Sequence, residues 1–361
     1  MPNDSTLAAQ VAPDAKILVA RLDSLGDCVL SSSFFMGLRR LFPQARLTGV
    51  FNETAAQLFG HCPLFDRVLQ VPPAPGEAWR SLLEAPYDLA ICPRWDVDHW
   101  ATRRLALLSQ APIRIGFDRG PYRHDEPIDG WAGAFFTHLV RAPCDCHEVM
   151  KGEALLRFLG AAEPAPDPRL WLTEAAKNWA GDFIRAQRLD RFVVLAVSAT
   201  WERRIWPVAN FLPVIDALVR RHPDLRFVVI GAEDAVASGA WLQQMRPEIV
   251  TSAVGAPPVL SSAALIARSD LYVGMDTGPM HLAAASGVPV VEISCHPLSG
   301  SADHPNSPSR FGPYATRSHI LRPAVPLAPC VDGCTAEHEP HCITQVATSD
   351  VAQAALALLE G

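Results

Sequence analysis

Short apolar segments alternate with helix-compatible segments along most of this sequence. The strands predicted in the first half are residues 16–20, 46–50, 67–71, 88–92 and 113–117. A helical segment at 31–42 follows the first of these strands and stops before a proline. Strands joined through helices run parallel, and strands buried on both faces are apolar throughout. The pattern therefore predicts an α/β fold with helices on both faces of a parallel sheet.

A proline-rich segment at 163–171 interrupts this alternation. Its three prolines disfavour both a helix interior and a central strand. We therefore predict a domain boundary there, with an amino-terminal domain at 16–168 and a carboxy-terminal domain at 169–361. Residues 1–15 are predicted to form a disordered lead.

The strand and helix pattern returns after the boundary and predicts a second α/β domain. Its predicted strands are residues 192–198, 226–234, 270–278 and 288–294. Residues 295–345 are rich in Pro, His, Ser and Cys and are predicted to be irregular, and residues 349–361 form an amphipathic closing helix. Two such domains carry ligand sites at the carboxyl ends of their strands, so we expect a site in a cleft that both domains face.

Composition narrows the class of protein. With 361 residues and 49% hydrophobic content, the chain is long enough for two domains with substantial cores. A net charge of -7 argues against nucleic acid as the main partner, since phosphate binding needs a clustered positive field. The amino-terminal residues lack the basic and apolar regions of a signal peptide, and we find no apolar run of membrane-spanning length, which together predict a cytoplasmic protein.

The turn RLDSLGDCVL at residues 21–30 joins the first predicted strand to its helix and contains two acids, Asp23 and Asp27. A carboxylate at this edge of a sheet could act as a general base. Either acid could instead cap the helix or interact with its dipole, and Asp23 could pair with Arg21. Spacing alone does not separate the two acids.

The segment at 273–293 carries a second strand-to-helix turn, with Asp276, Thr277 and Gly278 at the start of the helix. The amino terminus of a helix offers free backbone N–H groups and a positive dipole end, so this turn suits an anionic ligand such as a diphosphate. An ordinary helix capped by Asp276 or Thr277 is the alternative, and His281 could equally be a core histidine.

Several of these segments together resemble the family 9 glycosyltransferases, the ADP-heptose lipopolysaccharide heptosyltransferases and their relatives. Residues 276–287 match the family block D-T-G-x-x-H-L-A-A-A-x-G, and residues 21–30 match its opening pattern of a strand followed by Gly-Asp. RRIWPVANF at 203–211 resembles the family's K-x-W-P element, and GAED at 231–234 resembles its G-x-x-[ED] turn. The resemblance spans about residues 16–358.

This resemblance implies a GT-B fold, in which two Rossmann-like, doubly wound domains face a central cleft. The first domain would hold the acceptor and the second the nucleotide sugar. The implied donor-binding residues are Thr200 and Arg204 at the phosphates, Glu233 at the ribose, and Asp276, Thr277, Gly278 and His281 at the diphosphate and sugar. Arg204 stands where the family usually has lysine, and its planar fork changes the phosphate contacts that are available.

The Gly-Asp pair of the family pattern makes Asp27 the implied catalytic base. Acceptor-binding candidates in the first domain are Asp23, Arg94, Arg114 and Arg119. The three arginines are expected to follow first-domain strands, where their charge suits an anionic glycan acceptor. A role as surface charges or loop anchors is the alternative for each of them.

The implied activity is an inverting, metal-independent glycosyl transfer. Such a reaction needs a base for the attacking hydroxyl and a positive environment for the departing diphosphate, and no cofactor. The implied donor is a nucleotide diphosphate sugar, ADP-heptose, and the implied acceptor is a lipopolysaccharide core or another glycan, with at most peripheral contact with the inner membrane. A sugar-nucleotide epimerase and a non-catalytic sugar-nucleotide-binding homologue are the alternatives.

A cysteine cluster lies near the carboxyl end. Cys330, Cys334 and Cys342 stand in a short stretch with His338 and His341 between them. Cysteine and histidine at such spacing could hold a structural zinc or iron ion. A reduced cysteine loop is the alternative, and the sequence slightly favours it. Neither interpretation makes the cluster catalytic.

Overall fold

The computed structural model describes residues 6–72, 76–84, 86–95, 98, 101–118, 134–143, 145–255 and 258–361. Contacts divide the chain into two compact units, Met1–Trp171 and Leu172–Gly361. The division falls at the end of the proline-rich segment at 163–171.

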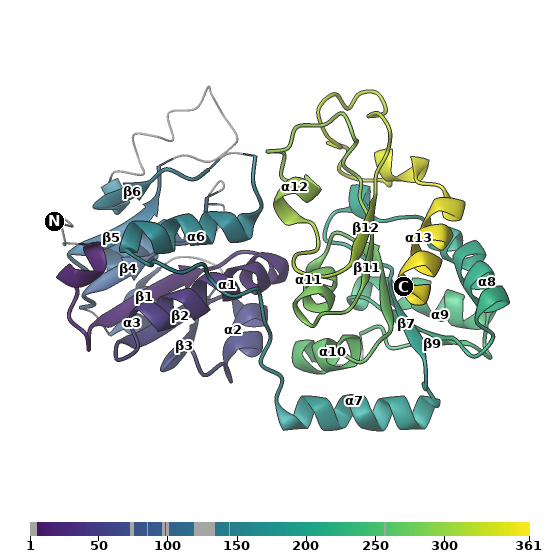
Figure 1. Ribbon diagram of the computed structural model, residues 1–361, viewed down its shortest axis with the longest axis horizontal. Coiled ribbons are helices and arrows are strands. Elements are labelled where there is room, and N and C mark those ends of the chain that lie inside the picture. The colour runs from purple at the N-terminus through teal and green to yellow at the C-terminus, as the bar shows by residue number, and fades with distance from the viewer. Residues whose placement is uncertain are drawn as a thin grey trace. The chain divides into compact units, whose positions relative to one another are not determined.

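Unit 1 is built on a parallel six-stranded sheet with the order β3-β2-β1-β4-β5-β6 (Figure 1). Its strands are β1 Lys16–Arg21, β2 Arg46–Phe51, β3 Arg67–Gln70, β4 Leu89–Ile91, β5 Ile113–Phe117 and β6 His138–Val140. The first five confirm the predicted strands. β6 was not predicted, because its two apolar residues, Leu139 and Val140, stand between polar residues and form no apolar run.

Helices cover both faces of this sheet. They are η1 Leu7–Gln10, α1 Leu25–Leu41, α2 Glu53–Phe59, α3 Glu77–Leu83, α4 Arg103–Leu108 and α6 Glu148–Leu159. α1 packs with α2 and α6, whereas buried residues of α3 and α4 share a core with strand residues. Asp27 in the first turn of α1 and two arginines in its last turn complement the helix dipole.

Unit 2 repeats this architecture with a parallel sheet in the order β12-β11-β10-β7-β8-β9. Its strands are β7 Phe192–Ala196, β8 Arg226–Ile230, β9 Val250–Ser252, β10 Leu271–Met275, β11 Val290–Ile293 and β12 Ser318–Leu321. Counted within the unit and read from the other edge, this is the order 3-2-1-4-5-6 of unit 1. Both units therefore have the doubly wound, Rossmann-like topology that the sequence predicts.

The helical segments of unit 2 are α7 Glu174–Gln187, η2 Glu202–Arg204, η3 Val208–Asn210, α8 Phe211–Arg221, η4 Glu233–Ala235, α9 Val236–Met245, α10 Val259–Ile266, α11 Gly278–Ala285, α12 Pro308–Phe311, η5 Cys342–Gln345 and α13 Thr348–Glu360. α8, α9 and α13 contribute to one core with the sheet, and α10 packs with α7 and α11. The closing helix is thus confirmed as α13. The Trp206 indole N–H donates to the Val346 carbonyl at 3.2 Å, and this bond fixes the segment that leads into α13.

Two expectations need correction. Residues 6–15 are not a disordered lead: η1 packs on α6, and Leu7, Val11 and Ala15 are buried. Residues 1–5 lie outside the described residues. The segment 295–345 is not wholly irregular, because it contains α12, β12 and η5, and β12 extends the sheet by pairing with β11. These short elements were not predicted because the segment is rich in Pro, His, Ser and Cys, a composition typical of loops.

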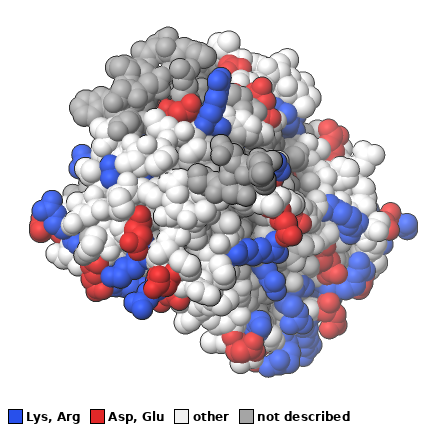
Figure 2. Space-filling view, turned by 60° about the vertical axis from the view of Figure 1, so that its left-hand side comes forward, with Lys and Arg blue, Asp and Glu red and all other residues white. Residues whose placement is uncertain are grey.

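In the described part of the chain, no helix has both the length and the apolar character needed to cross a membrane. On the face shown in Figure 2, acidic and basic side chains lie interspersed among uncharged ones. That face therefore carries a mixed charge pattern rather than a surface of one sign.

Candidate functional site

The carboxyl ends of β1 and β4 form the topological switch point of unit 1. The two strands are neighbours, and the chain proceeds from them toward opposite edges of the sheet. Asp23 follows β1, Asp27 lies in the first turn of α1, and Arg94 follows β4. Ligands of doubly wound sheets bind at such points, so the two acids occupy the expected edge.

Asp23 is buried in a network of ion pairs. One carboxylate oxygen lies 2.6 Å from Nε of Arg21, and the other contacts Nη1 of Arg94. The Asp23 side chain is only 2% exposed, and Arg21 also donates to the carbonyl of Pro93. Asp23 therefore links the end of β1 to the segment after β4 through its ion pair with Arg94.

Asp27 is the more accessible acid, with a side chain that is 20% exposed. Its carboxylate accepts a hydrogen bond from the Ser24 hydroxyl at 2.5 Å and lies 3.4 Å from Nη2 of Arg21. The structure thus separates two acids that spacing alone leaves equivalent: the Asp23 carboxylate is buried between two guanidinium groups, and the Asp27 carboxylate is partly exposed.

Arg114 does not lie where it was expected. It is the second residue of β5 rather than a residue after the strand, so it stands near the amino end of the parallel sheet, away from Asp27. Its Nε donates to the Phe135 carbonyl at 2.8 Å and its Nη1 to the Ala111 carbonyl at 2.7 Å, as a loop anchor would. Arg119 lies outside the described residues.

The corresponding switch point of unit 2 lies between β7 and β10, and it brings Arg204 to Asp276. Arg204, at the end of η2, has Nη1 at 3.2 Å from Oδ2 of Asp276. Its Nη2 and Nε donate to Oδ1 of Asn306 at 2.5 and 3.2 Å, and Nη2 also donates to the Pro305 carbonyl at 3.3 Å. The guanidinium is therefore held in a fixed orientation. Sequence reasoning missed Asn306, which lies in the segment predicted to be irregular.

Asp276 is a buried carboxylate that remains ionised. Burial acts to raise its pKa, but Arg204 and His281 outweigh this effect and lower it. Nε2 of His281 lies 3.6 Å from Oδ1 of Asp276. Glu292, in the neighbouring strand β11, behaves in the opposite way, because burial and the charge of Asp276 raise its pKa well above the usual range. Glu292 was also missed, and a lone acid in an apolar strand was its only signal.

The start of α11 lies at this same edge of the sheet. Thr277 occupies the N-cap position, but its side chain makes no capping hydrogen bond to the helix. Its hydroxyl instead lies 3.3 Å from both the Met275 carbonyl and the Tyr272 hydroxyl. The helix begins at Gly278. Pro279 has no N–H and the Met280 N–H donates to the Thr277 carbonyl at 3.0 Å, so the Gly278 N–H and the positive end of the helix dipole are what this turn offers an anion.

Thr200 and Glu233 lie after neighbouring strands at this edge. Thr200 stands between β7 and η2, Glu233 opens η4 after β8, and both are exposed. The two loops are linked where the Ala232 N–H donates to the Ser198 hydroxyl at 3.1 Å. Trp201, next to Thr200, is 48% exposed, and sequence reasoning overlooked it.

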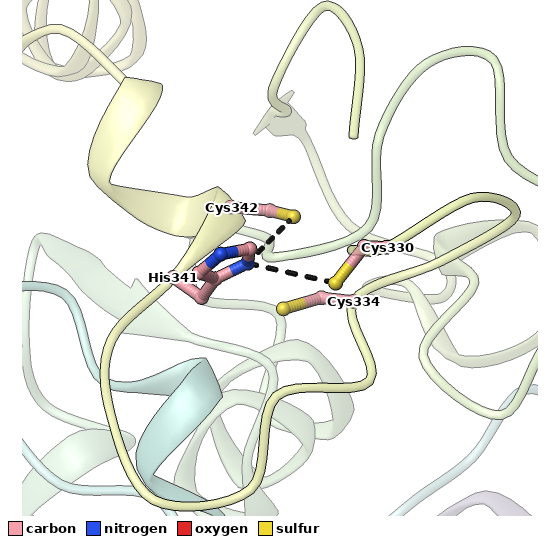
Figure 3. A group of neighbouring side chains, drawn as sticks. All are labelled: Cys330, Cys334, His341 and Cys342. Atoms are coloured by element: carbon pink, nitrogen blue, oxygen red, sulfur yellow. Dashed lines mark hydrogen bonds between the residues drawn. The ribbon is translucent and has the colours of Figure 1, made fainter. Parts of the chain in front are cut away.

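The cysteine cluster is compact. Cys330, Cys334, His341 and Cys342 each offer one ligand atom, and these four atoms lie within 4.8 Å of one another (Figure 3). His341 joins the three predicted cysteines, whereas His338 has a side chain that is 92% exposed. The three cysteines are free thiols in the structure, and the four ligand atoms are close enough to hold one ion, so the arrangement is compatible with the reduced loop that the sequence slightly favours and with a metal site.

A family model for glycosyltransferase family 9 (heptosyltransferase) matches residues 76–339. Among characterised proteins, the lipopolysaccharide core heptosyltransferase OpsX of Haemophilus influenzae is 19% identical over 310 residues, which cover 84% of this chain and 83% of OpsX.

Solved structures of glycosyltransferases share the fold of this chain. A family 9 glycosyl transferase from Veillonella parvula superposes with a TM-score of 0.74 at 21% identity, and the match covers 96% of this chain and 97% of the other. The ADP-heptose lipopolysaccharide heptosyltransferase II of Escherichia coli gives a TM-score of 0.73 at 18% identity, with 96% and 98% covered.

Proposed function

Because this chain belongs to glycosyltransferase family 9 and has the GT-B fold, we propose that it is an inverting heptosyltransferase. The proposed donor is ADP-heptose, and the proposed acceptor is a hydroxyl of a lipopolysaccharide core or a related glycan. The names of its relatives support both assignments. The proposed location is the cytoplasm, where the protein would reach lipid-linked acceptors through peripheral contact with the inner membrane.

One observation carries the proposal: each sheet places complementary chemistry at its own switch point. Unit 1 offers the accessible carboxylate of Asp27. Unit 2 offers the Arg204 guanidinium beside the uncapped start of α11. A base for an attacking hydroxyl and a cationic site for a leaving diphosphate are the two groups that inverting transfer requires.

Asp27 is the proposed general base. Its carboxylate takes the proton of the acceptor hydroxyl while the hydroxyl oxygen attacks the anomeric carbon of the donor. The bond between that carbon and the diphosphate oxygen breaks, and ADP leaves with the electron pair. Because attack occurs opposite the leaving group, the product has the inverted anomeric configuration. Asp23, held between two guanidinium groups, serves the fold instead.

Arg204 and the start of α11 are proposed to receive the negative charge that develops on ADP. Asp276 and Asn306 act as positioning residues, because they hold the guanidinium from two sides. Thr200 and Glu233 are proposed to contact the nucleotide from adjacent loops of the same edge. His281 supports the site by keeping Asp276 ionised.

Replacing Arg204 is expected to weaken ADP binding. Arg204→Ala removes a charge-assisted hydrogen bond to the diphosphate, which is worth roughly 1.5 to 3 kcal/mol, or roughly 10- to 150-fold in Kd. Isothermal titration calorimetry with ADP measures this change.

Arg246→Ala is the matched control for this experiment. Arg246 belongs to the same unit and pairs with Asp216 between α8 and α9, so its loss removes one positive charge away from the β7 and β10 edge. The control should bind ADP as the parent does. Unchanged ADP affinity in Arg204→Ala would remove Arg204 from the donor site.

The transfer step is proposed to need no metal ion, because the Arg204 guanidinium and the α11 start supply the positive field. We therefore expect turnover in EDTA to equal turnover with added Mg²⁺ when EDTA leaves the metal content of the cysteine cluster unchanged. Initial rates of ADP release measure both. A loss of activity in EDTA that Mg²⁺ restores would contradict this mechanism, since it would assign the leaving-group charge to a bound ion.

A further inference from the structure

The four ligand atoms of the cysteine cluster lie within 4.8 Å of one another. The side chains of Cys330, Cys334 and Cys342 are buried, and His341 is half-buried. Nδ1 of His341 lies 3.5 Å from Sγ of Cys330 and 3.4 Å from Sγ of Cys342. Figure 3 shows the four side chains pointing toward one another. Ligand atoms of a tetrahedral zinc-thiolate site lie about 3.8 Å apart, so little movement would close the cluster around an ion.

Backbone amides support the sulfur atoms from outside. The N–H of Thr335 donates to Sγ of Cys330 at 3.3 Å, and the N–H of Leu327 donates to Sγ of Cys342 at 3.4 Å. Outer hydrogen bonds of this kind orient metal ligands and stabilise negative charge on them. A buried cysteine that serves only as a small apolar residue needs none of these features.

The cluster is connected to the donor-site arginine by one buried side chain. Nδ2 of Asn306 donates to the Cys334 carbonyl at 3.2 Å, and Oδ1 of Asn306 accepts from Nη2 of Arg204 at 2.5 Å. Asn306 is 2% exposed, so its amide has little freedom to turn elsewhere. A second hydrogen bond also joins η2 to the cysteine loop: Nη1 of Arg203 donates to the Ala336 carbonyl at 3.4 Å.

We propose that Cys330, Cys334, His341 and Cys342 bind one tetrahedral divalent metal ion that fixes the Cys334 carbonyl and, through Asn306, the orientation of Arg204. Three sulfurs and one imidazole nitrogen form a closed structural set that suits zinc, and ferrous iron shares this ligand chemistry. The ion takes no part in transfer. It prepares Arg204 for the diphosphate, and this second half of the inference rests on the proposed function.

Elemental analysis of the purified full-length chain tests the site itself. We expect about one equivalent of metal per chain, and the analysis shows whether it is zinc or iron. Co²⁺ added to the reduced, metal-depleted protein should give the intense visible bands of tetrahedral cobalt with thiolate ligands. Absence of both bound metal and cobalt bands, or a disulfide within the cluster of the unreduced protein, would overturn the site.

Variants at His341 address the ligand set without disturbing the buried cysteines. His341→Ala should lose most of the bound metal, whereas His341→Cys, which restores a fourth ligand, should retain it. Cys146→Ser is the control, because Cys146 belongs to unit 1 and should leave the metal content unchanged. Full metal content in His341→Ala would exclude the histidine from the site.

The connection to Arg204 is tested separately. Asn306→Ala should keep its metal yet bind ADP about tenfold more weakly, and metal-depleted parent protein should show a similar loss, because each leaves Arg204 without its oriented partner. If neither Asn306→Ala nor metal depletion changes the affinity for ADP, the proposed link between the metal site and Arg204 is wrong, whereas the metal site itself is unaffected. Failure of the metal-loaded parent to bind ADP would instead contradict the proposed function, and the metal analysis would be unaffected.

Discussion

Asp27→Asn is expected to lower turnover by about 10² to 10⁴, the contribution of a positioned general base. The amide keeps the size of the carboxylate but cannot accept the proton of the acceptor hydroxyl. It can still bond to Ser24, because a hydroxyl both donates and accepts, and it remains beside Arg21. ADP affinity and melting temperature should therefore stay close to those of the parent. Initial rates, calorimetry with ADP and thermal unfolding measure these three quantities.

Asp350→Asn is the matched control for Asp27→Asn. Asp350 lies in the first turn of α13 and accepts from the Ser349 hydroxyl at 3.2 Å, so the same charge is lost in a similar local setting. Its turnover should match the parent. If Asp27→Asn keeps full turnover, Asp27 is not the base. If Asp27→Asn lowers the melting temperature and the loss of turnover is explained by the loss of folded protein, the role of Asp27 is to stabilise α1.

Asp23→Asn is expected to lower the free energy of unfolding by about 3 to 5 kcal/mol, the usual cost of breaking a buried ion pair from one side. The amide cannot supply the charge that the Asp23 carboxylate shares with Arg21 and Arg94, and all three side chains are largely buried. Urea unfolding measures this loss, and turnover per folded molecule should fall far less than in Asp27→Asn.

Glu84→Gln provides the comparison for Asp23→Asn. Glu84 pairs with Arg67 at 2.7 Å, but both side chains are well exposed, so this substitution should cost less than about 1 kcal/mol. A stable Asp23→Asn variant that lacks turnover would exchange the roles of the two acids and assign the base to Asp23.

Much of the fold could be predicted from the sequence because long apolar runs dominate it. The strands β1 to β5 in unit 1 and β7, β8, β10 and β11 in unit 2 were all predicted, as was the closing helix. The strands β6, β9 and β12 were not, since polar residues interrupt their short sequences, HLV, VTS and SHIL, and leave no continuous apolar run. The buried lead was also missed, because isolated residues such as Leu7 and Val11 show no period.

Candidate site residues could be predicted where they lie in short local motifs. Asp27 and the 276–278 turn could be identified from strand-to-helix patterns and the family resemblance. Spacing alone did not separate Asp23 from Asp27, because the burial of Asp23 depends on Arg94 in a distant loop, and only the family resemblance favoured Asp27. Likewise, Asn306 meets Arg204 across 102 positions of the sequence, and no local pattern encodes that contact.

Acceptor-dependent release of ADP is the most direct test of the central proposal. The parent protein is incubated with ADP-heptose, with and without a lipopolysaccharide core acceptor, and ADP is quantified while NMR reports the anomeric configuration of the product. We predict that ADP is released only when the acceptor is present and that the new glycosidic bond has the inverted configuration. Release or isomerisation of the donor without any acceptor, or a product that retains the donor configuration, would contradict it.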